Sequence, residues 1–259
     1  MSRIKVPDLP GRLQPAEGRG FDSDSDWWRL EVGAAGFGAV EAAGFHVEQC
    51  RFRGTDMAAG SWRNGMFRDC RLESVNVAGV MAQRCSMLGS QVSGARATGL
   101  QWTDGVFKDV TFQDCRLDLA GFRFSRFTRV EFVECRMEQV DFTGADLSGV
   151  RFVGCDLRSV KLNEAKAVGA RFERCSLEGM SGVEALAGAT VMAADLVPLT
   201  FTLAGALGIS IETGELLRDC QQDCRVGYGG EAVPGGRDDQ KVAFAAGFGV
   251  VAGVEPDDP

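Results

Sequence analysis

The residues best suited to chemistry in this 259-residue chain are its cysteines. Four of them recur at intervals of twenty, at Cys115, Cys135, Cys155 and Cys175. A stacked repeat would place these thiols in a column that could form disulfides or hold a soft metal ion. Stacking at about 4.8 Å is wider than the Cβ separation of about 3.8 Å that a disulfide prefers, and a straight column does not converge tetrahedrally on a metal. We therefore expect reduced thiols that pack as small buried apolar groups.

Other candidates for catalysis or cofactor binding are few. His46 is the one histidine of the chain, which leaves no Ser-His or Cys-His machinery with a partner nearby. The phosphate-binding, dinucleotide-binding and HExxH motifs are absent from the sequence. Cys220 and Cys224 form a CxxxC pair without a second pair, which is a weak metal signal. The sequence therefore predicts no catalytic residue, no metal site and no cofactor, and an enzyme is the least favoured function.

The cysteines belong to a longer pattern with a period of five. From Val47 to Leu177 every fifth residue, 27 in all, is apolar, and in 25 of the 27 units the residue two places earlier is small or valine. A period of five fits neither a helix nor a flat strand. It fits a solenoid whose coil has four short sides, each with one inward side chain. Phe45 and Leu100 break the small-residue rule and should bulge or face a smaller neighbour, because interiors are close-packed.

A coil of twenty residues would stack each residue on the one twenty positions later. One interior column is then rich in aromatic rings: Phe52, Leu72, Val92, Phe112, Phe132, Phe152 and Phe172. Because each coil supports only its neighbours, both ends of such a rod must be capped.

The pattern resembles that of the pentapeptide-repeat family, whose consensus is similar to A(D/N)LxG; Ala145-Asp146-Leu147-Ser148-Gly149 matches it directly. The resemblance implies an all-β fold, a right-handed quadrilateral parallel β-helix with four units per coil. Cysteine, valine and arginine replace Ala and Asp at many positions before the central residue. These departures concern the surface and the fine packing, and leave the period unchanged.

Four segments follow from the limits of the repeat: an N-terminal extension and cap at 1–44, the β-helix at 45–180, a C-terminal capping helix at 181–212 and a tail at 213–259. Residues 1 to about 20 are polar with three prolines, so we expect them to be mobile. Trp27 and Trp28 should cover the open N-terminal end of the rod. The Gly-rich, acidic tail is expected to be disordered.

The predicted helix lies in the stretch from Thr190 to Glu212. Asp195 is its expected N-cap, Pro198 lies in the first turn, where it is tolerated, and Gly208 is the expected stop. Its residues are apolar nearly all round, which implies burial. The helix could be a lid on the end of the rod or, as better-known family members suggest, a homodimer contact.

The sequence gives indications of location as well. It starts without an apolar leader segment and has no uninterrupted run of 18 apolar residues, so we expect neither secretion nor a membrane span. Nine cysteines without a secretory signal favour a reducing compartment. The expected location is the cytoplasm.

Charge separates the possible functions. The chain has a net charge of −8, yet residues 45–180 hold 19 Lys and Arg against 17 Asp and Glu. The resemblance implies a possible DNA mimic that binds a type II topoisomerase such as DNA gyrase, and mimicry requires a negative field that this repeat lacks. The favoured function is therefore a non-enzymatic scaffold for protein–protein interaction with an unknown partner, and the DNA mimic is second. Direct nucleic-acid binding is not expected, because it would require more arginines beside aromatic residues.

One surface stands out as a possible partner contact. Leu119 and Phe124 occupy corner positions where this chain usually has Gly, Asp or Ser, and Phe124 leads onto the side that carries Val106 and Leu88 in earlier coils. Exposed apolar patches of this kind often mark binding sites. The alternative is that the segment around Trp27 and Trp28 folds over the patch.

Overall fold

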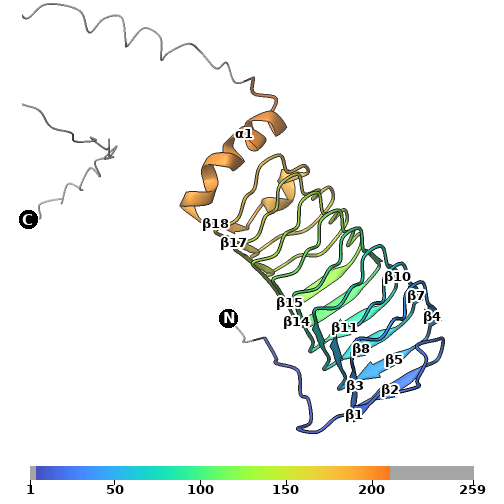
Figure 1. Ribbon diagram of the computed structural model, residues 1–259. Coiled ribbons are helices and arrows are strands. Elements are labelled where there is room, and N and C mark those ends of the chain that lie inside the picture. Colours follow the sequence, from blue (N-terminus) through green and yellow to red (C-terminus); the bar gives the residue numbers. More distant parts are fainter. Residues whose placement is uncertain (1–3, 211–259) are drawn as a thin grey trace, which may run out of the picture. The chain divides into compact units, whose positions relative to one another are not determined.

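Coils of about twenty residues stack in parallel to build the protein. The computed structural model describes residues 4–210, which form a right-handed, four-sided parallel β-helix of about nine turns with one α-helix at its C-terminal end (Figure 1). From β2 (Asp26–Trp28) to β17 (Arg171–Glu173) each strand residue pairs with the one twenty positions later, so Phe112, Phe132, Phe152 and Phe172 are aligned in consecutive coils. The predicted fold and its period are confirmed.

The four sides of the coil are numbered here in chain order. Face 1 consists of β2 (Asp26–Trp28), β5 (His46–Glu48), β8 (Met66–Arg68), β11 (Ser86–Leu88) and the first halves of β14 (Val106–Gln113) and β15 (Arg126–Val133). Face 2 consists of β1 (Gln14–Pro15), β3 (Leu30–Val32), β6 (Arg51–Arg53), β9 (Arg71–Glu73), β12 (Gln91–Ser93), the second halves of β14 and β15, β16 (Arg151–Val153), β17 (Arg171–Glu173) and β18 (Thr190–Val191).

Face 3 has single bridges instead of strands, from Gly36 through Asp56 and Asn76 up to Ser176. Face 4 is a separate four-stranded sheet of β4 (Glu41–Ala43), β7 (Ser61–Arg63), β10 (Met81–Gln83) and β13 (Gln101–Thr103), and single bridges continue it to Ser181.

The interior is filled as the period predicts. All 27 central residues from Val47 to Leu177 are buried. In the aromatic column, the ring centroids of Phe112 and Phe132 lie 4.8 Å apart with the rings 7° from parallel, and Phe132 and Phe152 lie 5.2 Å apart at 5°. From Phe112 onward, the rings of this column therefore stack at about the inter-strand spacing.

The N-terminal end departs from the prediction in three ways. The predicted boundary at residue 45 falls inside the stacked coils, because β2 pairs with β5 and β3 with β6. Residues 4–20 lie against the rod, with Pro7 buried and the Lys5 ammonium 3.1 Å from the Asp69 carboxylate. The two tryptophans separate: Trp27 is a central residue of the first coil, buried beside Phe21, whereas Trp28 points outward. Successive residues of a strand face opposite sides, so the pair cannot cap the rod together.

The C-terminal end carries two 3₁₀ turns, η1 (Val183–Leu186) and η2 (Ala193–Asp195), and then the helix α1 (Leu196–Ala206). The helix begins directly after Asp195, as predicted, and Gly208 follows its end with a φ of 70°. The Asp195 side chain does not cap the helix. Its Oδ2 accepts a hydrogen bond of 2.9 Å from the buried backbone N–H of Cys175.

The predicted burial of this helix is wrong. Leu199 is buried, but the side chains of Val197 and Phe201 are 68% and 60% exposed. The end of the rod contacts one side of the helix, so the other side remains uncovered. Within residues 4–210, no helix is long and apolar enough to cross a bilayer. The predicted tail at 213–259 lies outside the described residues.

Candidate partner-binding surface

Leu119 and Phe124 are corner residues with a left-handed backbone. Their φ angles are 60° and 57°, and their side chains are 54% and 51% exposed. Most corners have this conformation, which glycine adopts at little cost, as at Gly144 and Gly149. For a bulky residue the left-handed region is a true outlier, costing about 1–2 kcal/mol. The two side chains are therefore held outward in a conformation that their residue types disfavour.

These two corners flank face 4 within one coil. Gly121 lies between them, and the Gln101 side chain folds over it from the coil before, in the space where a Cβ would be. The Gln101 amide donates a hydrogen bond of 3.3 Å to the carbonyl oxygen of Leu119. The ring of Phe124 covers Gly144 in the next coil, again where a Cβ would lie. Gly121 beneath the Gln101 side chain and Gly144 beneath the Phe124 ring thus leave room for these two side chains to lie along the rod.

The other two predicted contact residues fall in different places. Val106 begins β14, two residues beyond the corner directly beneath Phe124, and is 40% exposed. Leu88 ends β11 at the opposite edge of face 1 and lines a pocket together with Lys5 of the N-terminal segment. The structure therefore groups Val106 with Phe124, places Leu119 across face 4 and separates Leu88 from the other three.

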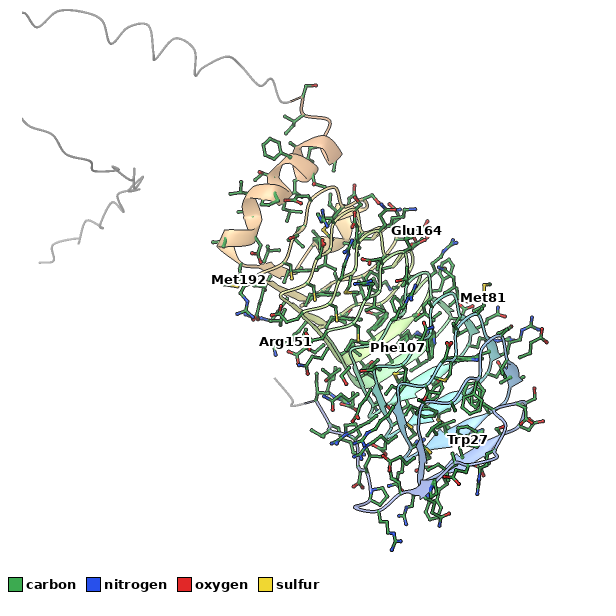
Figure 2. The ribbon with its side chains drawn as sticks, viewed as in Figure 1. Trp27, Met81, Phe107, Arg151, Glu164 and Met192 are labelled. Carbon is green, nitrogen blue, oxygen red and sulfur yellow. The ribbon has the colours of Figure 1, made fainter. Side chains whose placement is uncertain are left out.

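Sequence reasoning missed Met81, which is 61% exposed on β10. Figure 2 shows it projecting from the edge of the rod, whereas Phe107 lies inside. Met81 lines a shallow groove of about 240 Å³ on face 4 with Ser61, Gln83, Gln101 and Thr103. An apolar residue directly before a buried centre, at an outward position, was the signal in the sequence. We define the face-4 surface as Met81, Gln101, Val106, Leu119 and Phe124.

The face-4 surface differs in charge from the rest of the rod. From Ser61 to Arg123, the outward strand positions of face 4 include Arg63 and Arg123 and no acidic residue, and the neighbouring acidic residues, Asp104 and Asp118, lie at its corners. Elsewhere, opposite charges are paired between coils: Arg151 lies 2.7 Å from Glu131 and 3.6 Å from Glu173 on face 2. Depletion of acidic residues and lysine around Met and Phe is typical of the centre of a protein interface.

The alternative in which the tryptophan segment covers the patch is not what the structure shows. Trp27 is inside the first coil, and Trp28 lies on face 1 of that same coil. Phe124 belongs to a coil nearly one hundred residues further along, and half of its side chain is exposed.

The cysteines form buried columns, as predicted. All seven in the described residues are free thiols in the core. In the column that begins at Cys115, each Sγ donates to the carbonyl oxygen of the residue 23 positions earlier, with distances of 3.4 to 3.6 Å. Burial raises the pKa of Cys50 to about 11, so this thiol stays protonated at neutral pH. Among residues 4–210, no three His, Cys, Asp or Glu side chains are arranged to hold a metal ion.

An enclosed cavity lies inside the rod between Trp62 and Trp102. Its volume is about 30 Å³ and its walls are apolar, among them Val92 and Ala97. The cavity exists because the coil between the two tryptophans has small central residues. A site without polar partners holds water poorly, and the Cys115 thiol is the one nucleophilic side chain among its lining residues.

Comparison with known proteins agrees with this architecture. Residues 105–182 and 125–202 match the model of the pentapeptide repeat region. No curated protein matches the chain. Among solved structures, the chain is similar to HetL, a pentapeptide repeat protein involved in heterocyst differentiation regulation from the cyanobacterium Nostoc, with 14% identity, coverage of 67% of this chain and 92% of that chain, and a TM-score of 0.26.

Two further solved structures are similar. Full-length QnrB1, a plasmid-mediated fluoroquinolone resistance protein, has 17% identity, with coverage of 67% and 99% of the two chains and a TM-score of 0.24. Rfr23, a pentapeptide repeat protein from the cyanobacterium Cyanothece, has 10% identity, with coverage of 59% and 88% and a TM-score of 0.21. The five-residue register, the four-sided coil and the match to the repeat model together establish that this chain belongs to the pentapeptide-repeat family.

Proposed function

We propose that the protein is a non-enzymatic scaffold that binds a partner protein through the face-4 surface. The observation that carries this proposal is the pair of half-exposed apolar side chains of Leu119 and Phe124, at corners where the repeat otherwise has glycine, alanine or polar residues. Glycine at either corner would relieve the backbone and remove apolar area from water. Large apolar side chains that stay exposed at two neighbouring corners, with no gain for the fold itself, are typical of a binding surface.

The test separates binding from folding. Phe124→Ser should weaken partner capture and leave the melting temperature nearly unchanged, and Phe124→Gly should do the same while relieving the corner. The matched control is Gln139→Gly, which makes the same change at an exposed polar corner with a φ of 58°. Tagged wild-type and variant proteins are compared by quantitative mass spectrometry of what they retain from the native cytoplasm. A partner retained equally by wild type and Phe124→Gly would rule out this surface as its contact.

The cytoplasm is the proposed location. Seven buried cysteines remain free thiols in the described part of the chain, and such thiols suit a compartment that keeps cysteine reduced.

We further propose that two copies associate through α1. Val197 and Phe201 are one helical turn apart and exposed, and Leu196 beside them is 45% exposed. Sedimentation should report a dimer for the wild type, and Phe201→Asp should shift it toward the monomer, whereas Thr200→Asp on the adjoining exposed position should have a smaller effect. A monomeric wild type at high micromolar concentration would refute the dimer.

Duplex mimicry toward DNA gyrase ranks second, because charges on the rod cancel locally. Arg136 contacts Asp118 at 3.1 Å and Glu138 at 3.4 Å, and Arg158 contacts Asp156 at 2.7 Å. Alternating signs leave little field beyond a Debye length of about 8 Å. We expect the full chain not to inhibit gyrase supercoiling. Potent inhibition that weakens steeply with added salt would move DNA mimicry to first place.

A further inference from the structure

The first coil at the N-terminal end is stacked on an incomplete rung. β1 pairs with β3 at an offset of sixteen residues, with Gln14 opposite Leu30, instead of the usual twenty. The usual offset returns at Asp24, whose N–H bonds to the carbonyl of Ala43. Between β1 and Asp24 the chain is therefore four residues shorter than in a regular coil, and the side that is missing is face 3.

The skipped side leaves a backbone edge without a partner. Gly36 is paired with Asp56, but the hydrogen bonds of this bridge are made by the residues on either side of Gly36. The Asp56 N–H donates to Ala35 O at 2.9 Å, and the Phe37 N–H donates to Asp56 O at 2.6 Å. In a parallel ladder the N–H and C=O of Gly36 itself then point the opposite way, toward the missing rung. Among the described residues, no backbone group takes up the Gly36 amide on that side.

A groove of about 540 Å³ lies over this edge. Val32, Ala35 and Phe37 are apolar residues of its lining, and Pro15 and Ala16 of the incomplete rung line it as well. Phe37 is held from within by Trp27, with ring centroids 5.7 Å apart. The groove therefore has an apolar lining and lies beside the free backbone edge at Gly36, between the lining residues Ala35 and Phe37, and these two features favour the addition of an extended segment.

Charge indicates what kind of segment fits. Glu17, Arg19 and Glu31 also line the groove. Residues 1–44 hold seven acidic against five basic residues, a net charge of −2, in contrast to the net +2 of residues 45–180. Residues 1–44 are thus more negative than residues 45–180. Glu31 is already paired with Arg53 at 3.3 Å, so a basic side chain of the partner would be favoured beside Glu17.

We propose that this groove binds an extended segment of a partner protein, which adds the missing face-3 rung in parallel, places an apolar side chain against Phe37 and directs a Lys or Arg toward Glu17. The backbone of the segment accepts the hydrogen bond of the Gly36 amide. This site is separate from the face-4 surface, so either can fail without the other.

The probe for the test is a labelled peptide that copies a rung of this rod. Residues 54–60 form the next rung of face 3, with the sequence Gly-Thr-Asp-Met-Ala-Ala-Gly. The peptide Gly-Thr-Lys-Met-Ala-Ala-Gly keeps the apolar centre and supplies the basic residue. Bound to the full chain, it should slow hydrogen exchange of the Gly36 amide at least tenfold, as measured by NMR, while the amide of Gly65 in the next coil is unchanged. The peptide with Asp instead of Lys should bind more weakly, and the difference in affinity between the two peptides should shrink as salt is added.

A matched pair of variants isolates the backbone contact. A Cβ at Gly36 would meet nothing within 4 Å, so Gly36→Ala should bind the peptide within twofold of wild type by fluorescence anisotropy. Gly36→Pro removes the N–H and should weaken binding at least tenfold. If the proline variant melts at a lower temperature, the exchange measurement on wild type decides instead. Unchanged Gly36 exchange at millimolar peptide, or equal binding by two folded variants, would overturn the proposal.

Discussion

The phenyl ring of Phe45 lies where residue 65 would carry its side chain, so Gly65 and Phe45 together fill one place in the core. A Cβ built on Gly65 would overlap the ring, and Phe45 is fully buried. Gly65 has no left-handed backbone that would itself require glycine. The glycine is therefore needed for space, because the preceding coil has a phenylalanine where the repeat normally has a small residue.

We expect Gly65→Ala to lower the free energy of unfolding by about 1–3 kcal/mol, the usual cost of overpacking a core. Urea denaturation measures it. The control is Gly33→Ala, where a Cβ would meet nothing within 4 Å. In Phe45→Ala the space is released, so adding Gly65→Ala to that variant should cost much less. Full additivity of the two changes would contradict the shared-space explanation.

Phe132 is stacked in the middle of the aromatic column between Phe112 and Phe152. Phe132→Ala should lower the free energy of unfolding by about 3–5 kcal/mol, through lost burial and a residual cavity. Phe132→Asp should be worse, because the charge cannot reach water. Phe124→Ala serves as the comparison at an exposed ring. A thermal melt of Phe132→Ala that matches the wild type would disprove its assigned place in the core.

Acid should weaken the ion pair between Asp109 and Arg129. The Arg129 guanidinium donates two hydrogen bonds to this carboxylate, at 2.5 and 2.6 Å, and they hold the pKa of Asp109 below its ordinary value. A depressed carboxyl pKa stabilises the fold above the unfolded-state pKa of about 3.9, and this stabilisation is lost as pH falls through the folded-state value. Denaturation followed between pH 6 and pH 2 should show a shallower loss for Asp109→Asn than for wild type. If the free energy of unfolding falls equally steeply with pH in both proteins, other carboxyl groups account for the loss of stability in acid.

The core thiols should be unreactive until the protein unfolds. Burial raises the pKa values of Cys50, Cys70 and Cys85, so little thiolate exists at pH 8 to attack an alkylating reagent. Iodoacetamide labelling followed by peptide mass spectrometry should show these three unlabelled in buffer and labelled in 8 M urea. Rapid labelling of Cys70 in buffer would indicate that its coil opens readily.

The interior of this fold could be predicted almost residue by residue from the sequence. Each coil repeats the same local rule, so the apolar centres from Val47 to Leu177 fixed the register without any knowledge of distant contacts. Phe45 illustrates the limit: the sequence predicted either a bulge or a smaller neighbour, and Gly65 is that neighbour. Both residues were visible twenty positions apart once the period was known.

The ends and the surface were less predictable, because no repeat governs them. The offset of sixteen at β1 cannot be read from a pattern of five, since Ala16 takes an inward place outside the register. The exposure of Phe201 depends on how much of α1 the end of the rod can cover, which composition does not specify. The predicted contact residues remain a prediction, and the structure separates them: Val106 lies two residues beyond the corner beneath Phe124, whereas Leu88 ends β11 at the opposite edge of face 1.

From β2 to β17 the offset between paired residues is twenty, so the number of residues in this part of the chain sets the length of the rod. Removing twenty consecutive residues from the middle of the rod would delete one whole coil, and every remaining centre would still point inward. The distance between the groove at Gly36 and the helix at Leu196 would shrink by one rung, about 4.8 Å. Removing nineteen would misalign every column beyond the cut. In evolution, the spacing of whatever binds at the two ends can therefore change only in whole coils, through duplication or loss of a block of four repeats.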